Sequence, residues 1–123
     1  MNFLISIFFL VFYVISINLA ISGTIKDNGV SVFMYHRIGE NKYPSTNVTL
    51  KQFNQHINHI VTNNYNIISL SDVVDIIKDE GEFKKNTISF SIDDAYESFY
   101  YNAWPEFNKN NIPVTLFISS EII

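Results

Sequence analysis

Two adjacent carboxylates near the end of the sequence are the residues best suited to chemistry. Asp93 and Asp94 follow an apolar run at residues 87–92 and come just before a helical pattern that begins at Tyr96. Neighbouring anions repel each other, so a bound cation is the simplest reason to place both at the end of a strand. One carboxylate can bind a divalent metal ion while the other acts as a base towards a water whose pKa the metal lowers to about 7.

A structural role competes with this chemistry for one of the two aspartates. Aspartate is a good N-cap residue, and capping of the following helix explains one carboxylate about as well as metal binding does. Capping does not explain why there are two. The histidines His56 and His59 share one side of a predicted helix, but they lie beside its apolar stripe, and we expect them to face solvent rather than a metal ion.

The predicted elements bring the aspartates and a histidine to one edge of a sheet. Strands are expected at residues 30–35, where the run reads as buried, and at 67–70, 87–92 and 112–118. Between them, helices are expected from Thr49 to about residue 63, from residue 71 to about 78, and over residues 96–108. This alternation predicts a parallel sheet covered by helices, with reactive groups at the carboxyl ends of the strands. His36 follows the first strand at the place that Asp93 and Asp94 occupy in the third.

The helices have apolar sides that predict their packing. In the first, residues 50, 53, 57, 60 and 61 recur at helical spacing, and in the second Val73, Val74, Ile76 and Ile77 are expected to be buried. Pro105 is expected to kink the third helix or end it early. Arg37 and Glu40 are expected to form a surface ion pair that contributes little to stability.

Composition limits the classes of function. The chain has 123 residues, a net charge of −4 and no cysteine, which fits one domain without disulfides or thiolate metal sites. No basic cluster exists beyond the Lys84–Lys85 pair, so we expect no nucleic acid partner. Residues 1–22 are strongly apolar and predict a signal peptide or, less favoured, a membrane anchor, with membrane association through residues 3–21. Residues 23–29 then form a linker.

Three segments resemble the polysaccharide deacetylases, the family of the NodB-homology domain. Residues 91–96 (SIDDAY) resemble the family motif T-F-D-D-G/A, and residues 35–38 (YHRI) resemble its Y-H-R-I/V opening. Residues 111–118 (NIPVTLFI) are similar to its G-I-P-A-T-F-F-V segment. The resemblance covers residues 30–123 and identifies them as the N-terminal, truncated part of such a domain.

The resemblance implies a fold, a reaction and a set of roles. The fold is an α/β fold, the front part of a distorted (β/α) barrel with parallel strands. The reaction is metal-dependent removal of acetyl groups from nitrogen or oxygen atoms of an acetylated polysaccharide by an exported, periplasmic, extracellular or membrane-anchored hydrolase. By family role Asp93 is the catalytic base and Asp94 is a ligand of a divalent metal ion, with zinc expected. We assign His36 a contact with substrate.

The sequence also departs from the family pattern. The motif H-(S/T)-x-x-H, which supplies two histidine ligands in the family, does not occur in these residues. We therefore expect the chain as given to be an incomplete fragment without activity. The alternatives are a non-catalytic, membrane-anchored remnant that binds glycan or a partner, and a magnesium enzyme of phosphoryl transfer, which lacks a glycine-rich phosphate loop here.

Overall fold

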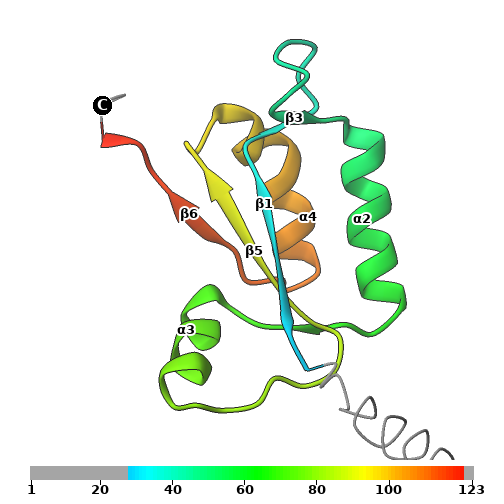
Figure 1. Ribbon diagram of the computed structural model, residues 1–123. Coiled ribbons are helices and arrows are strands. Elements are labelled where there is room, and N and C mark those ends of the chain that lie inside the picture. The colour runs from blue at the N-terminus through cyan, green and yellow to red at the C-terminus, as the bar shows by residue number, and fades with distance from the viewer. Residues whose placement is uncertain (1–27, 121–123) are drawn as a thin grey trace, which may run out of the picture.

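The strand that ends in Asp93, β5 (Thr87–Asp93), is the centre of a four-stranded parallel sheet (Figure 1). The computed structural model describes residues 28–120. Along one edge β5 pairs with β1 (Val30–Tyr35). Along its other edge it pairs first with β4 (Asn66–Ile67) and then with β6 (Thr115–Phe117). The predicted parallel sheet is therefore confirmed. The sheet is open over these residues, and its closure into a barrel stays a prediction.

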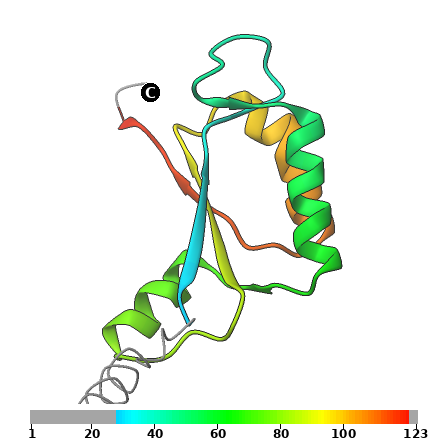
Figure 2. The ribbon, with the colours of Figure 1, turned by 45° about the vertical axis from the view of Figure 1, so that its right-hand side comes forward.

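One face of the sheet carries the core. Side chains alternate along a strand, so Ile88, Phe90 and Ile92 all point to the same side. Figure 2 shows the helices α2 (Leu50–Thr62) and α4 (Trp104–Lys109) on that side of β1 and β5. Phe90 is fully buried, and its ring centroid lies 5.2 Å from that of Phe107 on α4. The buried cluster comprises Ile38, Phe53, Ile57, Ile60, Ile88, Phe90, Ile92, Phe99, Ala103, Phe107 and Ile112.

The opposite face of the sheet is polar along β5 and exposed along β1. Ser89, Ser91 and Asp93 alternate onto this face, and Val32 and Met34 are the register partners of the two serines. Val32 and Met34 are 45% and 57% exposed, so the prediction of a buried first strand was wrong. The reason is that β1 forms an edge of the described sheet, whereas β5 has partners on both sides.

Helix α2 begins where the sequence predicts. The backbone N–H of Gln52 donates to the Thr49 hydroxyl, and the backbone N–H of Thr49 donates to Gln52 Oε1. These two hydrogen bonds form a capping box. Asn63 is the C-cap, and Asn64 takes a left-handed φ of 52° that asparagine tolerates. The predicted bounds of this helix are confirmed.

Helix α3 (Leu70–Lys78) begins earlier than predicted. The Ser69 hydroxyl accepts the backbone N–H of Asp72 at 3.1 Å and forms a second capping box, so the preceding strand ends at Ile67 rather than residue 70. Only Val73 of the four predicted apolar positions is buried, while Val74 and Ile77 are 42% and 59% exposed. The prediction of a four-residue buried side was wrong because α3 lies at one end of the sheet and packs through a narrow face (Figure 1).

The predicted third helix runs without a break from residue 97 to residue 109 but contains a π-helical turn. A π-helical turn, η1 (Phe99–Ala103), precedes α4, and the Trp104 N–H bonds to the Phe99 carbonyl five residues earlier. Pro105 has no N–H and stands in the first turn of α4, directly after the π-helical turn. The helix does not end early at Pro105, because it continues to Lys109, and the alternative of a kink stays a prediction. The last strand is shorter than predicted and runs only from Thr115 to Phe117.

A short parallel pair that the sequence did not predict lies between β1 and α2. It joins β2 (Arg37–Ile38) to β3 (Asn47–Val48). Within residues 28–120, no helix has the length and apolar character needed to cross a membrane. The apolar segment at residues 3–21 lies outside the described residues, as does most of the linker, so both stay predictions.

Candidate functional site

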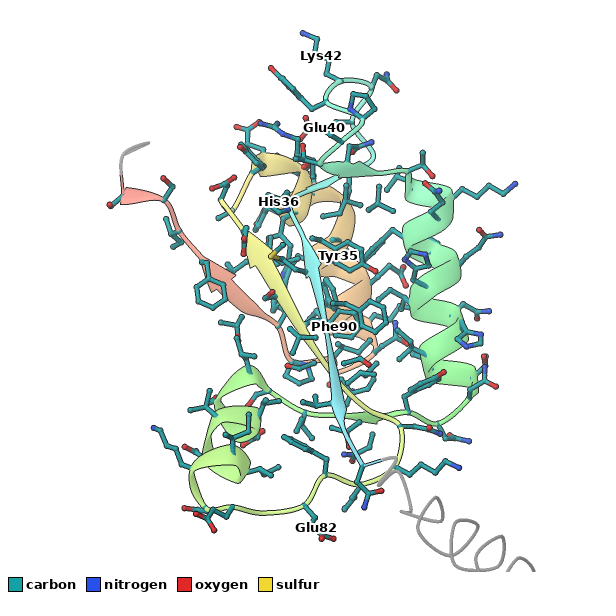
Figure 3. The ribbon with its side chains drawn as sticks, in the orientation of Figure 1. Tyr35, His36, Glu40, Lys42, Glu82 and Phe90 are labelled. Atoms are coloured by element: carbon teal, nitrogen blue, oxygen red, sulfur yellow. The ribbon has the colours of Figure 1, made fainter. Side chains whose placement is uncertain are left out.

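The parallel register places His36 beside Asp93. Tyr35 pairs with Ile92, and the next residue of each strand brings the imidazole and the carboxylate to the same edge of the sheet. His36 Nε2 lies 3.8 Å from Asp93 Oδ2, and the two side chains are 27% and 31% exposed. Figure 3 shows His36 at the upper end of β1, close to the end of β5. Both groups are therefore open to solvent and close to each other, although too far apart for a direct hydrogen bond.

Asp94 belongs to a tight turn in an unusual conformation. Its φ is 65°, and Ala95 follows with a φ of 49°. Aspartate adopts this left-handed region more often than most residues, but alanine does so at a cost of about 1–2 kcal/mol relative to the right-handed form. Strain of this kind persists only where the surrounding structure enforces it, and it often occurs at functional sites.

Neither aspartate caps the following helical segment. The helical segment begins at Glu97, and among the described residues no hydrogen bond joins the side chain of Asp93 or Asp94 to its backbone. The capping alternative was therefore wrong, and the two carboxylates remain available at the end of β5.

The described residues do not hold a metal ion by themselves. No group of three histidine, aspartate or glutamate side chains between residues 28 and 120 is arranged to bind one. Asp94 can supply one ligand, and the others would have to come from outside this range, because a catalytic zinc site normally uses three protein ligands.

The other two histidines do not contribute to this site. His56 and His59 are exposed on α2, as predicted. His56 Nδ1 lies 2.9 Å from the Tyr35 hydroxyl, and His59 Nε2 lies 3.5 Å from the Tyr65 hydroxyl. Burial raises the pKa of Tyr35 to about 12.

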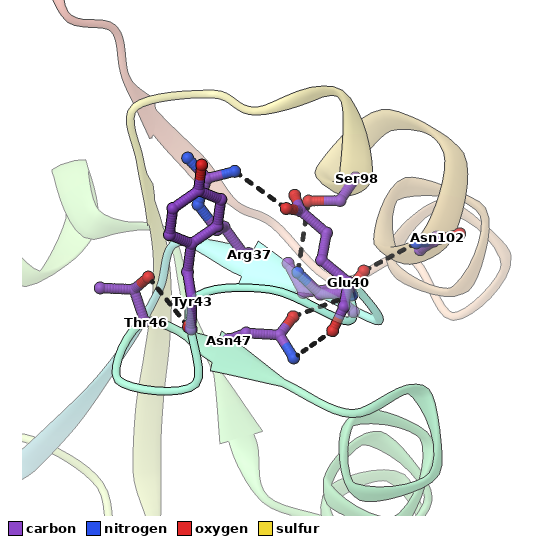
Figure 4. A network of polar contacts seen from close by, with 8 residues as sticks. Arg37, Glu40, Tyr43, Thr46, Asn47, Ser98 and Asn102 are labelled. Atoms are coloured by element: carbon purple, nitrogen blue, oxygen red, sulfur yellow. Dashed lines mark hydrogen bonds and ion pairs between the residues drawn. The ribbon is translucent and has the colours of Figure 1, made fainter.

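Beside the site lies a polar network that the sequence did not reveal. The Arg37 guanidinium carbon lies 3.4 Å from the centre of the Tyr96 ring and 4.3 Å from that of Tyr43. The predicted pair with Glu40 is confirmed at 2.9 Å, but the Arg37 side chain is only 17% exposed (Figure 4). The signal in the sequence was the placement of an arginine directly after His36 and of a tyrosine two residues after Asp94.

Two open pockets flank this network. One, of about 300 Å³, is lined by Met34, Tyr35, His36, Arg37 and residues 45–48. The other, of about 560 Å³, is lined by Arg37, Glu40, Tyr96, Glu97, Ser98, Tyr101 and Asn102. Asp93 and Asp94 line neither pocket. His36 is therefore the candidate site residue that borders a hollow in the described surface.

Comparison by sequence relates the chain to N-deacetylases. No family model matches it. It is 28% identical over 93 residues to the poly-beta-1,6-N-acetyl-D-glucosamine N-deacetylases of Staphylococcus aureus strains MSSA476 and MRSA252. The match covers 76% of this chain and 32% of each relative, so the chain spans about a third of their length.

Comparison by structure gives the same relation for the fold. The structure of IcaB from Ammonifex degensii matches 74% of this chain and 38% of its own, with a TM-score of 0.64 and 20% identity. The Streptococcus pyogenes deacetylase PplD matches 72% of this chain and 42% of its own, with a TM-score of 0.62 and 21% identity. A de-N-acetylase from Aggregatibacter actinomycetemcomitans matches 71% of this chain and 36% of its own, with a TM-score of 0.60 and 21% identity. The resemblance to the polysaccharide deacetylases is thus confirmed, and the chain is similar to part of such a domain.

Proposed function

We propose that this chain supplies the aspartate-bearing part of a hydrolase that removes acetyl groups from the amines of an acetylated polysaccharide. The observation that supports the proposal is the position of Asp93, which ends the central parallel strand 3.8 Å from His36 in a chain similar to N-deacetylases. The similarity does not favour the non-catalytic alternative. Because the chain spans only part of its relatives, the activity is proposed for the complete protein to which these residues belong.

Each site residue has a proposed role. Asp93 acts as general base and takes a proton from the attacking water, and its partial exposure leaves a path for that water. Asp94 is one ligand of a divalent metal ion, for which we expect zinc, with the remaining ligands outside residues 28–120. His36 contacts the substrate at the pocket that it lines. Water adds to the acetyl carbonyl, the carbon–nitrogen bond breaks, and acetate and a protonated sugar amine are the products.

The proposed location rests on the apolar N-terminal residues. Because residues 1–22 have the pattern of a targeting segment, we propose that the protein is exported, by a signal peptide in residues 1–22 or by an anchor there. Cleavage before residue 23 in an exported form, read by N-terminal sequencing, would separate the signal peptide from the anchor.

A hybrid protein tests the proposed activity. Residues 30–118 would replace the matching segment of the S. aureus N-deacetylase, and acetate release from N-acetylated poly-β-1,6-glucosamine would be measured. We expect turnover by the hybrid and a loss of at least about 100-fold in kcat for Asp93→Asn, the range of a lost general base. The matched control is Asp75→Asn, which makes the same change at an exposed position on α3.

Two results would contradict the proposal. One is a folded hybrid without acetate release, which would show that these residues do not support the reaction. The other is full turnover by the Asp93→Asn hybrid, which would remove Asp93 from the chemistry even if the family relation holds.

A further inference from the structure

Arg37 lies between the two segments that carry the candidate site. It follows His36 directly in sequence, and its guanidinium stacks on the ring of Tyr96, two residues after Asp94, at 3.4 Å from the ring centre. The centre of the Tyr43 ring also lies close to the guanidinium, 4.3 Å from its carbon. A cation held over an aromatic face is attracted by the ring, most strongly where water is partly excluded, and the Arg37 side chain is only 17% exposed.

The partner of Arg37 is itself fixed. Arg37 Nη1 donates a hydrogen bond to Glu40 Oε2 at 2.9 Å, and the hydroxyl of Ser98 together with Arg37 lowers the pKa of Glu40. The backbone of Glu40 is held at both ends, because its N–H donates to Asn47 Oδ1 at 2.9 Å and its carbonyl accepts from Asn47 Nδ2 at 2.8 Å. The carboxylate is therefore a stable anchor for the guanidinium.

The backbone beside Arg37 is tied to the same helical segment. The Ile38 N–H donates to Ser98 Oγ at 3.3 Å, and the Ile38 carbonyl accepts from Asn102 Nδ2 at 2.7 Å (Figure 4). Ile38 is fully buried, so these bonds satisfy backbone groups that water does not reach. The segment after β1 is thus bonded to the segment after β5 through both backbone and side chains.

The site needs such a connection for two reasons. His36 and Asp93 are 3.8 Å apart, so no direct hydrogen bond fixes one relative to the other. The Asp94–Ala95 turn has a left-handed backbone at both residues, which the surroundings must enforce. Tyr96 is the first residue after this turn, and its contact with Arg37 acts where the turn ends.

We propose that Arg37 is a positioning residue that holds the Asp93–Tyr96 turn against His36 by stacking on Tyr96. The contribution of Arg37 to catalysis rests on the proposed function. The contact between Arg37 and Tyr96, which we call the clamp, lies wholly within the described residues. Lysine cannot take the place of Arg37 here. An ammonium group lacks both the planar surface that stacks on an aromatic ring and the paired N–H donors that bind a carboxylate.

Hydrogen exchange in the full 123-residue chain tests the clamp. Arg37→Lys keeps the charge and removes the planar stack. We expect the backbone amide of Phe99, which donates to the Tyr96 carbonyl at 2.9 Å, to exchange at least about tenfold faster while the amides of residues 88–90 keep their rates. Tyr96→Leu is expected to have the same effect, whereas Tyr96→Phe keeps the ring and should retain the original rates. The matched control is Lys109→Gln, which removes another i,i+3 ion pair, with Glu106 at 3.5 Å on α4.

Three results would overturn the proposal. They are unchanged exchange at the Phe99 amide in Arg37→Lys, an equal effect of Tyr96→Phe and Tyr96→Leu, and an equal acceleration at residues 88–90, which would mean a general loss of stability. The outcome is separate from that of the hybrid assay. Protection of the turn by Arg37 in a chain whose hybrid is inactive would contradict the proposed function alone, and an active hybrid with an unaffected turn would contradict the clamp alone.

Discussion

Replacement of Ala95 by glycine should stabilise the protein, because the turn after Asp94 stores backbone strain. Ala95 has a φ of 49°, in the left-handed region where its Cβ crowds the following carbonyl. Relief of this crowding is worth about 1–2 kcal/mol. Glycine also gives the unfolded chain more freedom, which costs about 0.4–1 kcal/mol. At the midpoints of these two ranges, the difference predicts a net gain of about 0.8 kcal/mol in the free energy of unfolding.

Urea unfolding followed by circular dichroism and by the fluorescence of the single tryptophan, Trp104, measures this gain. We expect a higher midpoint at an unchanged slope, and a rise in melting temperature of about 3–6 °C, as a domain of 60–100 residues gains about 4–8 °C per kcal/mol. The matched control is Asn64→Gly, at an exposed left-handed position with a φ of 52°. Asparagine tolerates this region, so the control should gain little.

A urea midpoint for Ala95→Gly that is equal to or below that of the original chain would contradict strain at Ala95. An equal gain in Asn64→Gly would contradict it as well, because the effect would then come from added glycine and not from strain at residue 95.

Three further predictions follow from the fold. Gly39→Ala should destabilise the chain by at least about 1 kcal/mol in urea unfolding, because φ is 76° and the new Cβ would lie 2.6 Å from Leu50 Cγ; Gly29→Ala, with open space around it, is the control. Phe90→Ala should cost about 3–5 kcal/mol by the same measurement, since the ring is fully buried against Phe107, and a loss below 1 kcal/mol would contradict the described core. The Tyr35 pKa is raised from 10.0 to about 12, so its contribution to stability is complete below pH 10 and is lost as pH rises to about 12. Unfolding free energies of the original chain and Tyr35→Phe should therefore diverge over that interval, and parallel curves would refute the assignment.

The parts of the fold that local patterns encode were predicted from the sequence. Helix α2 has its cap at Thr49 and its asparagine end as predicted, and both signals are local in the sequence. Of its five predicted apolar positions, residues 53, 57 and 60 are buried, whereas Leu50 and Val61 are 42% and 41% exposed. The parallel order of the strands followed from the alternation of elements, and it predicted His36 and Asp93 at one edge of the sheet, where the structure has them.

The parts that depend on distant contacts were missed. The exposure of Val32 and Met34 depends on which strands flank β1, which residues 30–35 do not encode. Three strands and two helices separate Arg37 from Tyr96 in the sequence. The residues next to Arg37 therefore predict only its ion pair with Glu40 and not its stack on Tyr96. The early start of α3 was missed because Ser69 and Ser71 carry similar local signals for a helix start, and the helix uses Ser69 as its N-cap.

The pairing of β5 has a consequence for the order in which the protein forms. Among the described residues, β5 bonds to all three other strands of its sheet. In sequence, β1 precedes α2, β4 lies between α2 and α3, and β6 follows α4. Pairing strands that are far apart in sequence closes a long loop, and the entropy of this closure is lost before the pairing contacts stabilise the sheet. During synthesis β1 emerges well before its partner β5, and Asp93 is made only after β1, α2, β4 and α3. We expect the aspartate turn to be among the last parts of the described fold to become ordered.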